Sequence, residues 1–204
     1  MLNQIKKNLF DIRPHEWPRA LLLSLFFFLV IAVFWVLKPI KKSALISFYR
    51  VQEFQLLGME FGGAEAEQLA KVLNMLVVYA VVVLITVMIN KLKRQQVIYF
   101  FCGIISVLLV YYAFVMTNPG AFEVWSFYVF GDIFNSIMVG LFWAFSNDVN
   151  KPGQSKRLYG IVGLGGVLGG AFGAQFVRTY VTQESVGRQG LILGCVLAVA
   201  IIAA

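Results

Sequence analysis

Charged residues are scarce in this chain. Only 13% of its 204 residues are Asp, Glu, Lys or Arg, whereas 60% are hydrophobic. Soluble domains carry about 25% charged residues, so this composition predicts a membrane protein and excludes an ordinary soluble domain. The net charge of +7 suits nucleic acid in principle, but the basic residues lie at the ends of apolar runs, as membrane topology requires. We therefore expect the lipid bilayer as a partner, and no nucleic acid.

Histidine and cysteine are also rare. His15 is the only histidine, so neither a histidine-based catalytic triad nor a zinc site is expected. Cys102 and Cys195 both lie inside apolar runs, where they act as small hydrophobes, and their spacing fits neither a metal site nor a disulfide. No G-x-x-x-x-G-K-[ST] motif and no nucleophile–base pair occurs. The chain is predicted to have no enzymatic activity, no catalytic or metal-binding residues and no cofactor.

Long apolar runs dominate the sequence. Their lengths suit helices, and the period-2 alternation of a membrane barrel is absent. Glycine and proline separate the runs. We predict an all-α membrane protein, with a cytoplasmic juxtamembrane segment at residues 1–18 and a bundle of six transmembrane helices over 19–204. The predicted spans lie near residues 20–46, 69–90, 96–117, 122–146, 158–178 and 190–204.

The two ends of the chain carry further information. About 19 mostly polar residues precede the first span, and no small-residue cleavage site follows it, so we expect no signal peptide. The last run, at 190–204, is shorter than the roughly 20 residues that cross a bilayer. This predicts a truncated sixth helix in a fragment of a longer chain. Most of the 17 Lys and Arg residues fall on one side of the spans, which predicts a cytoplasmic amino terminus.

Three lysines stand at the far end of the first span. Lys38, Lys41 and Lys42 occupy positions i, i+3 and i+4, so they share a helix face, and Pro39 among them removes a backbone donor. A lysine at membrane depth costs at least ~2.5 kcal/mol unless it is partnered, snorkelling or facing water. Two interpretations are open. The cluster is either a cationic patch that meets phosphate or carboxylate, or an anchor at the interface.

One carboxylate lies within the fourth span. Asp132 is the only charged residue between Val124 and Phe145, and Asn135 and Ser136 follow it at i+3 and i+4. A lone carboxylate at that depth should face a cavity or a partner, and it can take a proton when unpaired. A structural ion pair with a lysine is the alternative. The predicted substrate-binding residues are Lys41, Lys38, Lys42, Asp132 and Asn135.

Glycines crowd the fifth span. They recur every four residues, a pattern that lets two helix backbones approach closely. A dinucleotide fingerprint would need a third glycine where Leu168 stands, so we favour packing over cofactor binding. The predicted helix-packing residues are Gly165, Gly166, Gly169, Gly170 and Gly173.

Four stretches, in order between residues 37 and 160, carry recognisable motifs. Each is close or identical to a motif shared by the members of one protein family. Leu37–Leu45 is close to the motif L-R-D-T-K-D-A-L, and Gly63–Ala66 is identical to G-A-E-A. Phe127–Asp132 is close to F-Y-V-M-A-E, and Phe142–Asn147 with Lys156–Gly160 is close to F-W-G-F-A-N and K-R-F-Y. With these motifs the chain resembles the nucleotide transporter family, which includes the ATP/ADP translocases of plastids and obligate intracellular bacteria. The pattern is that of a diverged bacterial member.

The resemblance implies a major-facilitator-like fold, in which two six-helix halves surround a central site and exchange nucleotides by alternating access. This chain would be the amino-terminal half, with a carboxy-terminal six-helix half as its missing partner, in a bacterial inner membrane. Lys41 falls on the family's first-span lysine and Asp132 on its fourth-span glutamate, both tied to transport. Lys38-Pro39 replaces Arg-Asp and Lys42 replaces an aspartate, so this cluster is more cationic than the family pattern.

The leading functional hypothesis is a secondary transporter of nucleotides or related phosphorylated anions. In the form that the resemblance implies, it is an antiporter that binds ATP. Two alternatives stay open. One is a membrane scaffold or anchor that kept the transporter fold without transport, and the other is a carrier of an unrelated organic anion.

Overall fold

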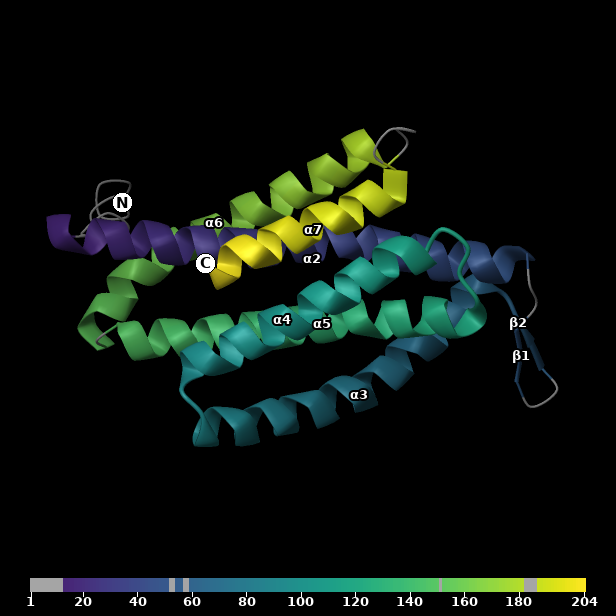
Figure 1. The fold of residues 1–204 in the computed structure, drawn as a ribbon, viewed down its shortest axis with the longest axis horizontal. Helices are drawn as coiled ribbons and strands as arrows, with labels where there is room; N and C mark the ends of the chain where they lie inside the picture. The colour runs from purple at the N-terminus through teal and green to yellow at the C-terminus, as the bar shows by residue number, and fades with distance from the viewer. Residues whose placement is uncertain (1–12, 52–53, 57–58, 151, 182–186) are drawn as a thin grey trace, which may run out of the picture.

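The computed structural model describes residues 13–51, 54–56, 59–150, 152–181 and 187–204. Most of the predicted juxtamembrane segment, residues 1–12, lies outside this part of the chain. Figure 1 shows the arrangement of the elements, whose bounds follow in chain order. They are the 3-10 turn η1 (Pro14–Glu16), α2 (Trp17–Val51), β1 (Phe54–Leu56), β2 (Met59–Phe61), α3 (Gly63–Lys91), α4 (Arg94–Val115), α5 (Ala121–Val149), α6 (Pro152–Tyr180) and α7 (Gly187–Ala203).

The predicted all-α membrane fold is confirmed. Within the described residues, five helices, α2 to α6, are long and apolar enough to cross a bilayer, and α7 is a shorter apolar helix of 17 residues. The sequence did not predict the short antiparallel hairpin of β1 and β2, in which Phe54 pairs with Phe61. Strands of three residues are too short to show an alternating pattern. Figure 1 places this hairpin at one end of the bundle, between α2 and α3.

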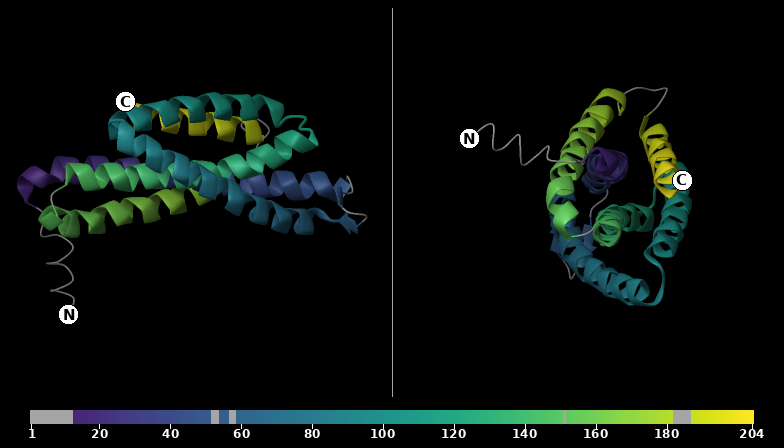
Figure 2. Two further views of the ribbon diagram at one scale, coloured as in Figure 1. Left: turned by 90° about the horizontal axis from the view of Figure 1, so that it is seen from below. Right: turned by 90° about the vertical axis from the view of Figure 1, so that its left-hand side faces the viewer.

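Helix α2 is the centre of the bundle. It packs against α6, α5, α7 and α3, and Figure 2 shows it end-on among the other helices. Pro18 lies in its first turn, where a missing N–H costs nothing. Pro39 lies inside the helix, which nevertheless continues to Val51. The neighbouring helices on several sides hold this long segment together despite the hydrogen bond that Pro39 cannot make.

The main core lies between α2, α4, α5 and α7. It contains fully buried side chains such as Leu37 of α2, Leu109 of α4, Phe134 of α5 and Ile192 of α7. Lipid tails are as apolar as these side chains. In a bilayer, therefore, the contacts between the helices are stabilised by close packing and not by the exclusion of water.

Five glycines of α6, the predicted helix-packing residues, face α2, the most extensive partner of α6. A Cβ atom built on Gly173 would lie 2.5 Å from the carbonyl oxygen of Ala32, and one on Gly169 would also overlap a backbone carbonyl of α2. A side chain at either position would therefore push the two helices apart. In chain order, Gly165, Gly166, Gly169, Gly170 and Gly173 meet Ser24, Phe27, Phe28, Trp35 and Ala32.

Helix α3 is the least covered of the long helices. Its apolar side chains are mostly exposed, as expected for a surface that faces lipid or another part of the protein. Near its start, Ala66 and Ala70 pack with Leu45 of α2 and Val124 of α5. This contact brings the first turns of α3 close to the lysines of α2.

Candidate functional site

An ion pair between buried Lys41 and half-buried Asp132 joins α2 to α5. Lys41 is only 4% exposed, and its Nζ lies 2.5 Å from Oδ2 of Asp132. The same ammonium group donates a hydrogen bond of 3.3 Å to the carbonyl oxygen of Tyr128 and lies 4.3 Å from the centre of the Tyr128 ring. A Cβ atom on Gly131 would lie 2.7 Å from Cδ of Lys41, so this glycine leaves room for the lysine stem.

The depth of the pair excludes a simple interfacial anchor for Lys41. Lys41 lies ten residues before the end of α2, and Asp132 lies eleven residues after the start of α5. At 1.5 Å per residue, each is about 15 Å from the same end of the bundle, the end that carries the hairpin. A charge buried at that depth needs a partner, because losing one member of a buried pair costs about 3–5 kcal/mol.

Asn74 of α3 completes this pair. Its Nδ2 donates a hydrogen bond of 2.9 Å to the Asp132 oxygen that also meets Lys41. Its Oδ1 is buried and has no hydrogen-bond partner among the described residues. Asn74 is not among the site residues predicted from the sequence, although a polar amide inside a predicted apolar span was a usable signal.

A second set of charges lies next to the first. Glu67 of α3 is buried, and its two carboxylate oxygens meet different lysines: Oε2 lies 3.3 Å from Nζ of Lys42, and Oε1 lies 3.1 Å from Nζ of Lys71. The lysine side chains are 54% and 59% exposed. Sequence reasoning also missed Glu67 and Lys71, because charges near a helix start resemble ordinary topology signals.

The three predicted lysines of α2 therefore have different surroundings. Lys41 points to α5 and Lys42 to α3, whereas Lys38 is exposed and lies 4.7 Å from the centre of the Trp35 ring. The last contact is a cation–π interaction. Asn135 is half-buried one turn beyond Asp132 on α5, and the ion pairs and hydrogen bonds above do not include it.

Two of the sequence motifs also meet in space. The hydroxyl of Tyr159 on α6 donates a hydrogen bond to Oδ1 of Asn147 on α5, and the Tyr159 and Trp143 rings lie 5.2 Å apart with their planes nearly perpendicular. These contacts join the end of α5 to the start of α6.

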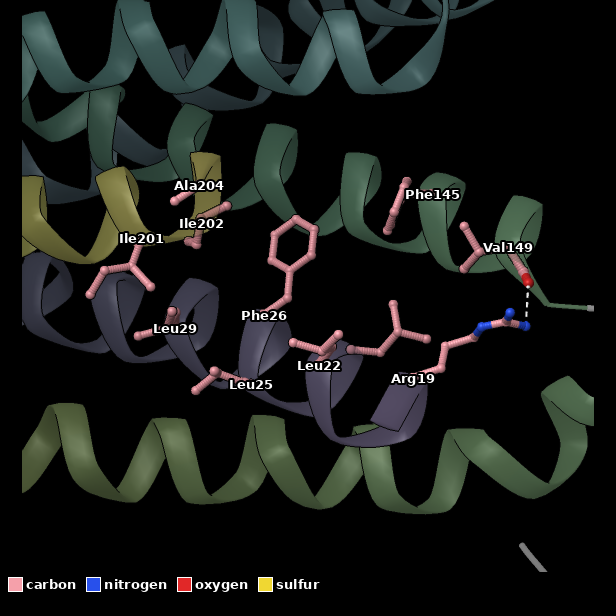
Figure 3. A pocket seen from close by; sticks show the side chains of 11 residues that line it. Arg19, Leu22, Leu25, Phe26, Leu29, Phe145, Val149, Ile201, Ile202 and Ala204 are labelled. Carbon is pink, nitrogen blue, oxygen red and sulfur yellow. Dashed lines mark hydrogen bonds between the residues drawn. The ribbon is translucent and has the colours of Figure 1, made fainter. Parts of the chain in front are cut away.

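A pocket of about 400 Å³ opens near the opposite end of α2. Figure 3 shows Phe26 and Phe145 on its walls, with Arg19 donating a hydrogen bond of 3.1 Å to the carbonyl oxygen of Val149. Its lining is mainly apolar. Arg19 and Lys41 are about 33 Å apart along α2, so this pocket is separate from the ion pair.

Five helices of spanning length among the described residues define a multi-pass membrane protein, and an ion pair inside such helices marks a candidate functional site. The family model described as TLC ATP/ADP transporter matches residues 117–192, which include Asp132 but not Lys41. This match confirms the predicted similarity to the nucleotide transporter family. It supports nucleotide transport in general and a transporter rather than an enzyme. No curated protein and no solved structure matches the chain.

Proposed function

We propose that this protein is a secondary carrier that exchanges nucleotides or related phosphorylated anions across the membrane by alternating access. The observation that carries the proposal is the ion pair of buried Lys41 and half-buried Asp132, which joins two helices at membrane depth. The family match over residues 117–192 supports the same class of cargo. In this proposal the chain is the amino-terminal half of a major-facilitator-like transporter, and a second six-helix half completes the site.

The ion pair suggests how cargo and conformation are linked. Without cargo, Asp132 neutralises Lys41, and α2 and α5 stay together. A phosphate group of the cargo then replaces Asp132 at Lys41, with Lys38 and Lys42 adding attraction. Lysine suits this role because its ammonium group acts as a compact point charge. Asp132 is then held by Asn74 or takes a proton, and α2 and α5 are free to separate.

The proposed orientation follows from charge. Exposed Lys91 ends α3 and exposed Lys93 directly precedes α4, and the connection between these helices lies at the same end of the bundle as the start of α2 (Figure 1). By the positive-inside rule this end faces the cytoplasm, and so does the amino terminus. The ion pair then lies nearer the outer face of a bacterial inner membrane.

Transport by the Lys41→Ala variant tests this function. The full-length protein is reconstituted in liposomes, and uptake of labelled ATP and ADP is measured. We expect at least a tenfold loss of uptake, because the cargo phosphate loses its buried cation; tenfold corresponds to about 1.4 kcal/mol. Lys91→Ala removes an exposed lysine at the other end of the bundle and should transport normally. Unchanged uptake by the Lys41→Ala variant would contradict the proposal.

A carrier of another organic anion is the second candidate. The charged groups of the site and the Asn74 amide recognise a phosphate or carboxylate without by themselves selecting a nucleobase. Thermal shifts of the purified protein with nucleotides, sugar phosphates and dicarboxylates separate the candidates, because a ligand stabilises the state it binds. Stabilisation by none of these anions would favour a scaffold or anchor instead.

A further inference from the structure

Helix α3 presents a second polar face to the ion pair. Glu67, Lys71 and Asn74 stand at positions i, i+4 and i+7 and therefore lie on one side of the helix. Glu67 binds Lys42 of α2, and Asn74 binds Asp132 of α5. These charged and polar contacts of α3 add to its apolar contacts with the bundle, which include Ala66 near its start and Ile85 near its end.

The three ion pairs form one network. Lys41 and Lys42 are consecutive residues of α2, and the Glu67 carboxylate also lies within Coulomb range of Lys41. Among the described residues, three lysines pair with two carboxylates, and a fourth lysine, Lys38, lies within Coulomb range of Lys41. The charged residues are thus Lys38, Lys41, Lys42 and Lys71, with Glu67 and Asp132. This arrangement leaves an excess of positive charge that a multiply charged anion can neutralise.

Glu67 and the two lysines that bind it differ in their exposure. The Glu67 side chain is 10% exposed, whereas the two lysine side chains that hold it are more than half exposed. The carboxylate is therefore covered, and the ammonium groups are open to an incoming anion. Each lysine uses a separate oxygen of Glu67, so a phosphate group with several oxygens can replace the carboxylate at both.

We propose that Lys42 and Lys71 form a second phosphate-binding position beside Lys41, and that Glu67 is its resident counter-ion. This inference rests on the proposed function and adds that the cargo carries more than one phosphate group. One phosphate replaces Asp132 at Lys41, and another replaces Glu67 at Lys42 and Lys71. A single cargo would then loosen both α5 and α3 from α2.

A buried oxygen of Asn74 is a hydrogen-bond acceptor beside the proposed second phosphate-binding position. Oδ1 of Asn74 has no hydrogen-bond partner among the described residues, and it lies on the same face of α3 as Glu67 and Lys71. Because this oxygen is covered while the ion pairs are formed, it becomes an acceptor for a hydroxyl or amino group of the cargo only once the cargo loosens α3 from α2. A hydrogen-bond acceptor next to a cluster of lysines is complementary to an anion that also carries hydrogen-bond donors.

Binding measurements on purified full-length protein test the second position. AMP, ADP and ATP serve as probes, because they differ in the number of phosphate groups. The variants are Glu67→Gln and Lys71→Gln, with Glu65→Gln as the matched control. Glu65 is an exposed glutamate two residues away, and its carboxylate accepts a hydrogen bond of 2.6 Å from the Gly62 amide.

The expected pattern depends on phosphate number. Glu67→Gln should strengthen ATP binding about three- to fivefold. The variant removes the carboxylate that competes with the cargo phosphate for Lys42 and Lys71. Lys71→Gln should weaken ATP binding by a similar factor and leave AMP binding unchanged. Glu65→Gln should bind all three probes like the wild type. If Glu67→Gln does not fold, Lys71→Gln decides the question, since its side chain is exposed.

Two results overturn the inference. In the first, folded Glu67→Gln binds ATP no better than the wild type; in the second, Lys71→Gln weakens AMP and ATP binding equally. If Lys41→Ala still abolishes ATP binding in either case, the proposed function stands and only the second position is lost. A wild-type protein that is folded but binds none of the three probes overturns both.

Discussion

Replacing Asp132 by asparagine tests the energetic role of the central ion pair. The change keeps the size of the side chain but removes the charge that Lys41 meets at 2.5 Å. Lys41 is 4% exposed, so water cannot take over from the lost carboxylate. The expected result is a large loss of stability, because a buried ammonium group is left without its counter-ion.

The structure also determines how much stability the Asp132→Asn variant should lose. Losing one partner of a buried pair costs about 3–5 kcal/mol. Lys41 keeps the Tyr128 carbonyl at 3.3 Å and the Tyr128 ring at 4.3 Å, which places the cost near the lower limit. At roughly 2–4 °C per kcal/mol for a chain of this size, we expect Tm to fall by about 10 °C.

Thermal unfolding in detergent measures this change. Glu65→Gln is the control, because it makes the analogous carboxylate-to-amide change at an exposed position where the amide oxygen can still accept the Gly62 hydrogen bond, and it should leave Tm nearly unchanged. The double variant Lys41→Met with Asp132→Asn removes both charges and should recover most of the lost stability without recovering transport. An Asp132→Asn variant that unfolds at the wild-type temperature would refute the reasoning, since Lys41 would then not depend on Asp132.

Two glycines give further predictions, with Gly140→Ala as the common control because a Cβ atom there meets nothing within 4 Å. Gly173→Val should destabilise the protein by about 1–3 kcal/mol, seen as a lower Tm, because a Cβ atom at this position would lie 2.5 Å from a backbone oxygen of α2. A Gly173→Val variant as stable as the control would contradict the close contact of α2 and α6. Gly131→Ala should reduce nucleotide uptake more than it reduces Tm, because its Cβ atom would lie 2.7 Å from the stem of Lys41 and displace the ammonium group from its partners. Equal uptake by Gly131→Ala and the control would show that the lysine tolerates displacement.

Much of the fold was predictable because membrane helices leave a strong signal. A helix must be long and apolar to satisfy its backbone within lipid, so composition and run length predicted the all-α membrane fold. The β1–β2 hairpin was missed because its short strands carry no comparable pattern.

The candidate site was predictable only in part. Lys41 and Asp132 stood out because a charge inside an apolar run is costly. Glu67 and Lys71 did not stand out, because charges near the start of a helix are common. Asn74 carries no charge, and its role depends on a carboxylate that lies 58 positions away in the chain.

The sequence alone determined that this protein crosses the membrane several times, that α6 has a face for close packing, and that ionisable groups lie at membrane depth. Only the tertiary structure decided the partners: Lys41 with Asp132, Lys42 with Glu67, and the glycines of α6 with α2. The physical reason is that helix periodicity determines which residues share a face. The packing of the whole bundle determines which helix that face meets.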